Sequence, residues 1–296
     1  MSKLTFIEIP KNFSFRYTIH SHGWSDLLPF QLNAEDQTLS YVFTDKDRKN
    51  PVTAVICDKA GKLQIEVSGA TFDEEKIRRD VRHCLRLDDD LSEFYKLVKK
   101  EKSMAWIANV NAGRLLRSPT VYEDLVKTIC TTNCSWSLTK KMTANLVEKL
   151  GEPAADGIFR AFPTAEAMAS VSADFYREEI RAGYRSSYFA ELAEAVAGGK
   201  IQPEKWLDSE LPTKELKREM KKIKGVGDYA AENLLKLVGN YEGLALDSWV
   251  RAQFYKKHNA GTICEDKEIE RFYEKFGVWR GLALWCDMTE KWFDRI

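Results

Sequence analysis

Residues 223–231 read Ile-Lys-Gly-Val-Gly-Asp-Tyr-Ala-Ala and stand between two stretches whose apolar residues recur at helical spacing. Two glycines around one apolar residue allow a tight turn with positive φ, and Val226 can anchor that turn in the core. The backbone amides around Gly227 then begin the next helix, where they and the helix dipole favour an anion. The stretch predicts a helical hairpin that holds a phosphate through its backbone. An ordinary glycine turn between two packed helices is the alternative interpretation.

The segment just before this hairpin is strongly basic. Residues 214–224 carry six Lys or Arg side chains against two Glu, a net charge of 6 − 2 = +4. The whole chain has 45 basic and 45 acidic residues, and this balance argues weakly against a nucleic-acid partner. Local clustering counts for more than the total, because phosphates are contacted by neighbouring side chains.

Asp247 follows Gly227 by 247 − 227 = 20 residues, after an apolar stretch and before an amphipathic helix. Its simplest role is that of a helix N-cap, for which Asp is a favoured residue. Capping also fixes the carboxylate and helps to keep it ionised. An ionised, fixed carboxylate suits a site where positive charge develops.

The order of the expected elements indicates an α+β fold. Five short strands are predicted at residues 4–9, 13–19, 41–44, 52–57 and 63–67. Antiparallel pairing is expected because no helix-length connection separates them. From residue 73 onward helical spacing prevails, in segments 73–85, 121–150, 214–223, 228–238, 248–258, 267–276 and 281–293, with further starts at Thr164 and with Thr213 as an N-cap. We therefore expect a small N-terminal β-rich domain, residues 1–72, followed by an all-α region, residues 73–296.

Several classes of site and protein are disfavoured. The six cysteines form no C-x-x-C pair and no zinc or iron–sulfur spacing, and His20 and His22 lack an evident third ligand. No apolar run is long enough to span a bilayer, and the first ten residues do not have the layout of a signal peptide. These features favour the cytoplasm, near the nucleoid, or the nucleus if the source is eukaryotic.

Hairpin, helix, short loop and aspartate-led helix together resemble the helix-hairpin-helix–Gly/Pro–Asp DNA glycosylases. Within that superfamily the chain is similar to the bacterial alkylpurine glycosylases and to the 8-oxoguanine glycosylases. Three further motifs carry the resemblance: Gly183-Tyr-Arg185, Ile129-Cys-Thr-Thr-Asn133, and Trp279-Arg-Gly-Leu-Ala-Leu-Trp285. The β-then-α layout agrees as well. The resemblance implies a helical subdomain at about residues 118–200, with hairpin and catalytic aspartate within residues 213–258.

The chain departs from the bifunctional members of that superfamily at one position. Those members carry a lysine two residues after the last hairpin glycine, and its amine attacks the sugar. Here the position is Tyr229, which cannot form a Schiff base. The resemblance therefore implies a monofunctional enzyme that hydrolyses the N-glycosidic bond and leaves an abasic site, without lyase activity.

The resemblance also implies roles for individual residues. Asp247 would be catalytic and would stabilise the oxocarbenium-like sugar. An aromatic pocket that favours a cationic, alkylated purine would be formed by Tyr229, Trp136 and Trp285. Contacts to double-stranded DNA, with Asn133 filling the gap left by the flipped base, are expected from Lys224, Gly225, Val226, Gly227, Ala230, Asn133, Tyr184 and Arg185.

Other interpretations stay open. The substrate could be an oxidised or deaminated base, in keeping with Gly183-Tyr-Arg185, or the hairpin could be a non-catalytic grip on DNA. Asn133 could be a loop residue, Tyr184 and Arg185 an exposed turn, and the tryptophans part of the core. No organic cofactor or catalytic metal is expected, whereas a monovalent cation on the hairpin carbonyls would be structural. We expect a monomer.

Overall fold

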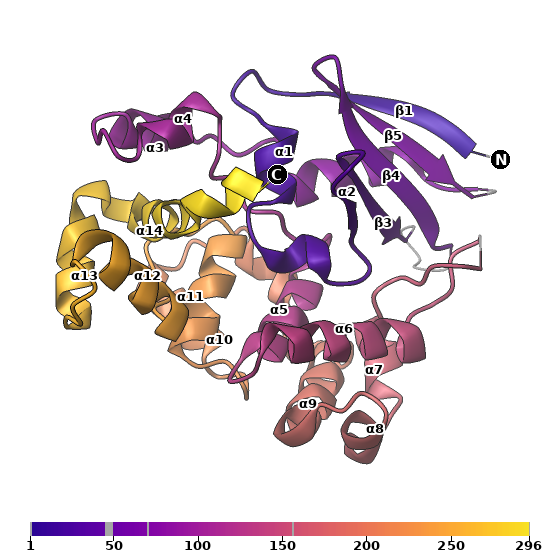
Figure 1. Cartoon of the computed structure of the whole chain (residues 1–296). Coiled ribbons are helices and arrows are strands. Elements are labelled where there is room, and N and C mark those ends of the chain that lie inside the picture. Colours follow the sequence, from indigo (N-terminus) through magenta and orange to yellow (C-terminus); the bar gives the residue numbers. More distant parts are fainter. Residues whose placement is uncertain (1, 45–49, 70, 156, 296) are drawn as a thin grey trace.

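A five-stranded antiparallel sheet forms the N-terminal part of the chain, with strand order β1-β5-β4-β3-β2 (Figure 1). The computed structural model describes residues 2–44, 50–69, 71–155 and 157–295. The strands are β1 (Ser2–Glu8), β2 (Gln31–Asn33), β3 (Thr38–Phe43), β4 (Val52–Lys59) and β5 (Lys62–Ser68). Between β4 and β5 the two turn residues Ala60 and Gly61 both have positive φ, 54° and 80°. This turn matches the twist of a tight hairpin and pairs Lys59 with Lys62.

The strand predicted at residues 13–19 is wrong, because α1 (Phe15–Ile19) occupies that position. The side chain of Ser14 caps the helix by accepting a hydrogen bond of 3.4 Å from the Tyr17 amide. Phe15 and Ile19, four residues apart, are buried on one side of it. Phe and Tyr favour a strand by composition, but the cap and the four-residue spacing decide for a helix.

Helices make up most of the remaining chain (Figure 1). They are α2 (Glu74–Cys84), α3 (Ser92–Val98), α4 (Ala105–Asn109), α5 (Val121–Thr131), α6 (Trp136–Leu150), α7 (Ala165–Ala169), α8 (Ala173–Glu178), α9 (Ser186–Ala197), α10 (Thr213–Met220), α11 (Asp228–Leu237), α12 (Ser248–His258), α13 (Asp266–Tyr273) and α14 (Arg280–Thr289). Short 3-10 helices are η1 (Gly23–Asp26), η2 (Gly183–Arg185), η3 (Pro203–Trp206), η4 (Glu274–Trp279) and η5 (Glu290–Arg295).

Two helical expectations need correction. The continuous pattern over residues 121–150 is interrupted between α5 and α6, where Asn133 has a φ of 46° that a helix cannot continue. Thr213 is the first residue of α10 and does not cap it. Its hydroxyl instead accepts a hydrogen bond of 2.7 Å from the Asn240 amide. The predicted helices at residues 73–85, 228–238 and 248–258 are confirmed as α2, α11 and α12 to within one or two residues.

The described residues form four apolar clusters, of which three are large. The first joins α5, α6 and α9 to the hairpin and α11, and Val226 lies in it at 4% exposure. The second lies between the sheet, α1 and α2, so the sheet shares its core with a helix beyond residue 72. The third joins α3 and α4 to α12, α13 and α14. The hairpin thus meets the first cluster on one side, and Asp247 precedes a helix of the third.

Within the described residues, no helix is long and apolar enough to cross a membrane.

Candidate active site

The predicted hairpin is present between α10 and α11. Gly225 has a φ of 88°, a conformation that glycine adopts readily, and a Cβ there would lie 2.9 Å from the Tyr188 ring. Gly227 precedes α11 without a side-chain cap, and a Cβ built on it would meet no atom within 4 Å. The first amides of α11 therefore face open space beside Gly227, as an anion site requires.

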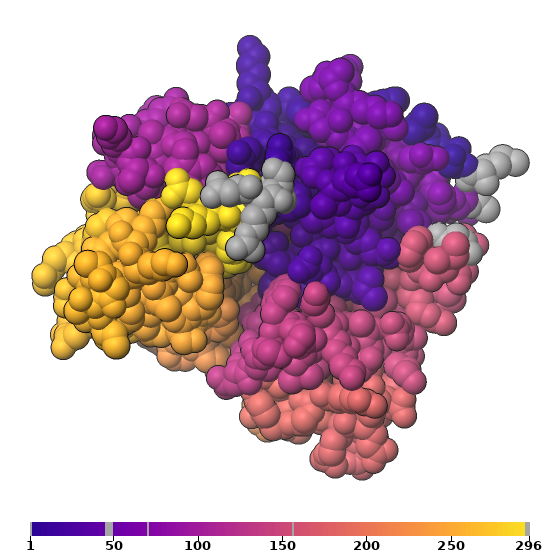
Figure 2. All heavy atoms as spheres, in the orientation of Figure 1, coloured from indigo at the N-terminus to yellow at the C-terminus, as the bar shows by residue number. Residues whose placement is uncertain are grey.

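A groove of about 830 Å³ brings the hairpin together with three other segments. It is lined by the loop after α5, by a tyrosine of η2 and another of α9, and by the residues around Asp247. Its lining residues are Thr131, Thr132, Asn133, Cys134, Tyr184, Tyr188, Lys221, Ile223, Lys224, Gly225, Val226, Gly227, Asp228, Tyr229, Ala230, Leu246, Asp247 and Ser248. The space-filling view shows a hollow between the orange and yellow helices α10–α14 and the magenta helices α5 and α6 (Figure 2).

Asp247 caps α12 and is half-buried. One carboxylate oxygen accepts a hydrogen bond of 2.7 Å from the Val250 amide. The side chain is thus fixed by its own helix and borders the groove.

Tyr229 lies in the first turn of α11 and borders the same groove. Burial and the neighbouring Asp247 carboxylate raise the pKa of its hydroxyl to about 12. The phenol is therefore neutral near pH 7 and can donate a hydrogen bond.

The loop after α5 presents Asn133 on the surface of the groove. Tyr184 reaches the same loop from η2, with its ring 53% exposed and its hydroxyl 3.4 Å from the Thr132 carbonyl oxygen. Both residues are placed where contact with a nucleic acid is open to them. Sequence reasoning expected both.

Arg185 lies elsewhere than expected. It is only 3% exposed, and its guanidinium donates to the carbonyl oxygens of Ile129 and Thr132 at the end of α5. The buried Arg185 side chain thus supports the loop after α5 by hydrogen bonds to its backbone. In this conformation the burial of Arg185 leaves little of it for the predicted contact with DNA.

The two predicted pocket tryptophans meet the N-terminal part of the chain rather than the groove. Trp136 donates to Asp26 at 3.2 Å, and its ring covers Gly23, where a Cβ would lie 2.3 Å from it. Trp285 donates to the Ser21 carbonyl oxygen at 2.9 Å. It also contacts Trp249 and Trp292, with ring centroids 6.1 and 5.6 Å away.

The lysines beside the hairpin are paired with carboxylates. Lys224 lies 2.6 Å from Glu191, and Lys217 and Lys221 each lie 2.9 Å from Asp228. These hydrogen bonds from Lys217 and Lys221 hold the pKa of Asp228 below its usual value. A phosphate that binds here must compete with these internal ion pairs.

Sequence reasoning missed several groove residues, among them Tyr188, Thr132 and Cys134. Tyr188 follows Tyr184 by four residues, a helical spacing that could have drawn attention to it. Trp249 lies two residues after Asp247 but does not line the groove. It packs in a cluster with Trp285 and Trp292. These residues come from other parts of the chain, so no local sequence pattern predicts the cluster.

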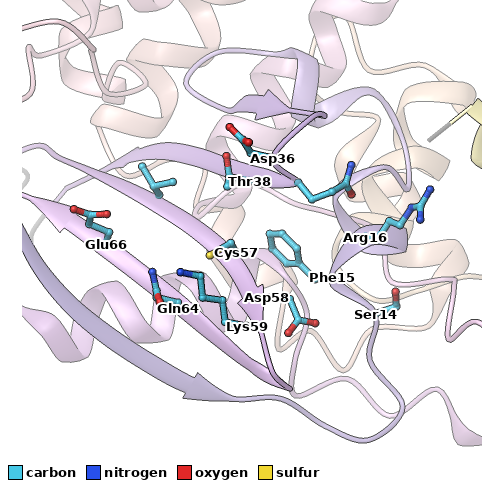
Figure 3. A pocket seen from close by; sticks show the side chains of 12 residues that line it. Ser14, Phe15, Arg16, Asp36, Thr38, Cys57, Asp58, Lys59, Gln64 and Glu66 are labelled. Atoms are coloured by element: carbon cyan, nitrogen blue, oxygen red, sulfur yellow. The ribbon is translucent and has the colours of Figure 1, made fainter.

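A second hollow, of about 470 Å³, lies on the sheet at the face away from α2 (Figure 3). Its charged side chains are of both signs, with Arg16 and Lys59 beside Asp36, Asp58 and Glu66. It contains none of the predicted site residues. Among the residues described, no three or more His, Cys, Asp or Glu side chains are grouped to hold a metal ion.

Several solved structures have the same overall fold as this chain. The 3-methyladenine DNA-glycosylase from Archaeoglobus fulgidus has a TM-score of 0.79 at 18% identity, covering 99% of this chain and 100% of the other. The Clostridium acetobutylicum 8-oxoguanine glycosylase/lyase, in complex with DNA that contains cytosine opposite 8-oxoguanine, has a TM-score of 0.76 at 20% identity, covering 100% and 99%.

The Schizosaccharomyces pombe 3-methyladenine DNA glycosylase, in complex with abasic DNA, has a TM-score of 0.53 at 19% identity and covers 68% of this chain and 96% of the other. At these identities the likeness extends to the fold alone. No curated protein sequence matches this chain.

A family profile covers more than half of the chain. The profile of the HhH-GPD superfamily base excision DNA repair proteins matches residues 126–292, which include the α5 loop, the hairpin and Asp247. The chain therefore belongs to the HhH-GPD superfamily and is a base excision repair DNA glycosylase.

Proposed function

We propose that this glycosylase is monofunctional and hydrolyses the N-glycosidic bond of an alkylated purine in double-stranded DNA. The observation that carries the proposal is the position of Asp247. A half-buried carboxylate, fixed by α12, borders the same groove as a hairpin with free backbone amides. The hairpin amides and Lys224 hold a phosphate, and Asp247 faces the sugar of the nucleotide that has rotated out of the stack.

In this mechanism Asp247 acts by its charge. As the bond to the base breaks, positive charge develops on the sugar, and a fixed carboxylate stabilises it without further reorganisation. An alkylated purine leaves readily because it is already cationic, so little general-acid help is needed. Asn133 fills the space in the duplex, and Tyr184 separates the neighbouring bases.

The lysines of the groove support hydrolysis rather than lyase chemistry. The groove is lined by Lys221 and Lys224, and both are ion-paired with carboxylates. An amine that is held by a carboxylate in this way is not free to attack the sugar. Tyr229 offers no amine at all, so water is the final nucleophile in our proposal.

A tryptophan cluster that lies outside the groove lining and includes Trp249, two residues after Asp247 in the chain, supports a cationic base. Trp249, Trp285 and Trp292 lie with ring centroids between 5.4 and 6.1 Å apart. Indole faces attract cations more strongly than other aromatic rings. We propose that the flipped base is received at the edge of this cluster, with Trp249 closest to the catalytic carboxylate in sequence.

Two measurements test this function. Duplexes that each contain one lesion, namely an alkylated adenine, hypoxanthine, uracil or 8-oxoguanine, are incubated with the enzyme and scored for strand breaks with and without alkali. We expect breaks at the alkylated adenine only after alkali. Breaks without alkali would refute the monofunctional assignment, and cleavage at 8-oxoguanine or uracil alone would name the alternative substrate class.

The second measurement replaces Asp247 with Asn. Asn is as good an N-cap as Asp, so thermal stability and binding to an abasic-analogue duplex should stay near wild type. Base release should fall by about 10³-fold or more, because the charge is lost. Undiminished base release would exclude Asp247 as the catalytic group, and a protein that binds but releases no base on any lesion would favour a DNA-binding role.

A further inference from the structure

The loop of residues 240–246 leads directly into Asp247 and has a strained, buried backbone. Leu244 and Ala245 are 6% and 3% exposed, and Ala245 has a φ of 53°. A residue with a Cβ occupies this left-handed region only where its surroundings hold it there. The position of the Asp247 carboxylate thus depends on what holds this loop.

Two side chains of α11 hold consecutive residues of the loop. One carboxylate oxygen of Glu232 accepts a hydrogen bond of 2.5 Å from the Ala245 amide. The ammonium group of Lys236 donates at 3.2 Å to the Leu244 carbonyl oxygen. Glu232 and Lys236 are four residues apart and so share one face of α11. They form a two-point clamp on the backbone two and three residues before Asp247.

The loop is also closed from its other side by the start of α14. The Gly281 amide donates at 2.8 Å to the Tyr241 carbonyl oxygen, and a Cβ on Gly281 would lie 2.0 Å from the Gly243 oxygen. Gly243 in turn packs on Glu232, since a Cβ on Gly243 would lie 2.8 Å from the Glu232 Cγ. The loop therefore lies tightly between α11 and α14, with little room to shift while the clamp is intact.

The charged groups of Glu232 and Lys236 interact with the basic helix α10 on one side and with the Asp247 carboxylate on the other. Lys236 is 2% exposed, and burial lowers its pKa to about 8, while the Glu232 and Asp247 carboxylates raise it. The second oxygen of Glu232 lies 2.6 Å from the ammonium group of Lys217, on the basic helix α10. Glu232 thus joins the helix before the hairpin to the loop before the catalytic carboxylate.

We propose that Glu232 and Lys236 are positioning residues, which hold the loop so that the Asp247 carboxylate stays where positive charge develops on the sugar. This inference rests on the proposed function of Asp247. Neither residue touches the substrate, since neither borders the groove. A displacement of about 1 Å at a reacting group can cost about 10²-fold in rate, so the clamp acts on rate rather than on DNA binding.

The test compares two substitutions at Glu232. Glu232→Gln keeps an oxygen that can accept from the Ala245 amide, whereas Glu232→Leu has a similar volume and no acceptor. Single-turnover base release is measured on the alkylated-adenine duplex, or on whichever duplex of the lesion panel the wild-type enzyme cuts. We expect Glu232→Leu to lose about 10- to 100-fold in rate, with near wild-type affinity for an abasic-analogue duplex. Glu232→Gln should recover most of that loss.

Asp80→Leu is the matched control, because it removes another partly buried ion pair, with Lys76 on α2, far from the groove. Its rate should equal that of wild type. If Glu232→Leu does not fold, Lys236→Met decides, since it keeps the length of the side chain and removes the donor to Leu244. A wild-type rate in Glu232→Leu or Lys236→Met overturns the clamp. Equal losses in rate and DNA binding in both Glu232 variants also overturn it.

The catalytic role of Asp247 and the positioning role of Glu232 and Lys236 can be refuted independently of each other. An Asp247→Asn enzyme that still releases base refutes the catalytic assignment, whatever the Glu232 variants do. An inactive Asp247→Asn enzyme beside a fully active Glu232→Leu enzyme refutes only the clamp.

Discussion

The Arg185 guanidinium donates to the Thr132 carbonyl oxygen from a buried position, although its neighbour Tyr184 is exposed. The two side chains remain in contact, with the guanidinium carbon 4.4 Å from the centre of the Tyr184 ring. One residue of the pair thus supports the loop that carries Asn133, and the other presents an aromatic ring above it. Their substitutions should have different consequences.

Arg185→Met should lower the free energy of unfolding by about 2–4 kcal/mol, because it leaves the Ile129 and Thr132 carbonyls without their buried donor. Chemical denaturation measures this loss. Tyr184→Ala should change stability by less than about 1 kcal/mol, since its side chain is largely exposed. It should nevertheless slow base release from a fully paired duplex more than from a duplex with a mismatch at the lesion. Equal stability of the two variants would contradict the division of roles.

The hairpin glycines offer a matched pair of substitutions. Gly225→Ala should destabilise the protein by about 1–3 kcal/mol, because φ is positive there and the Tyr188 ring leaves no room for a Cβ. Gly227→Ala should leave the melting temperature nearly unchanged, since its φ is −85° and the space beside it is open. Its new methyl group should weaken duplex binding by about tenfold if a phosphate approaches the backbone there. Unchanged binding in Gly227→Ala would place the phosphate elsewhere.

Glu191 competes with DNA for Lys224. Glu191→Gln should therefore raise the affinity for undamaged duplex a few-fold at low salt and steepen the dependence of binding on salt concentration. The control is Glu179→Gln, which removes a similarly exposed carboxylate from its ion pair with Lys149. Fluorescence anisotropy at several salt concentrations distinguishes the two. The same affinity in both variants would mean that Lys224 does not contact the phosphates.

The protein should lose stability in acid partly through His22. Burial lowers the pKa of His22 to about 4, and its ring lies 2.5 Å from the Leu116 carbonyl oxygen. As pH falls from about 6.5 to 4, the unfolded chain takes up a proton that the folded protein excludes, so stability falls in that window. His22→Gln, which can still donate to Leu116, should lose on the order of 2 kcal/mol less between pH 7 and pH 4.

Denaturant titrations at both pH values measure this difference. Asp124 opposes the loss of stability in acid, because burial raises the pKa of its carboxyl to about 6 and the folded state binds a proton there. This effect is the same in wild type and in His22→Gln. The comparison between the two proteins therefore isolates the histidine. Parallel losses in wild type and variant would show that His22 is not the responsible group.

The parts of the site that depend on local sequence could be predicted. The hairpin follows from the positive φ that Gly225 allows, and the cap at Asp247 follows from its place before an amphipathic helix. The groove collects most of the expected residues, including Asn133, Tyr184 and Tyr229. Each of them sits at a turn or a helix start, where short-range chemistry decides the conformation.

The parts of the site that depend on residues distant in the sequence could not be predicted. Arg185 is buried because carbonyls at the end of α5 receive its donors, and Trp285 turns toward Ser21, which lies 264 residues earlier in the chain. The composition of Phe15–Ile19 predicts a strand, but the cap at Ser14 begins a helix there. The clamp of Glu232 and Lys236 likewise depends on the position of the 240–246 loop, which no local pattern predicts.

The open backbone at Gly227 has a consequence for how such an enzyme searches a genome. A contact made by main-chain amides is the same at every nucleotide, because every phosphate has the same shape and charge. In our proposal the protein can therefore dwell at any step of the duplex with equal ease, and discrimination begins only when a base enters the groove. Searching and recognition would then be separate properties, so that substitutions around Trp249 could change the lesion removed without altering the time spent on undamaged DNA.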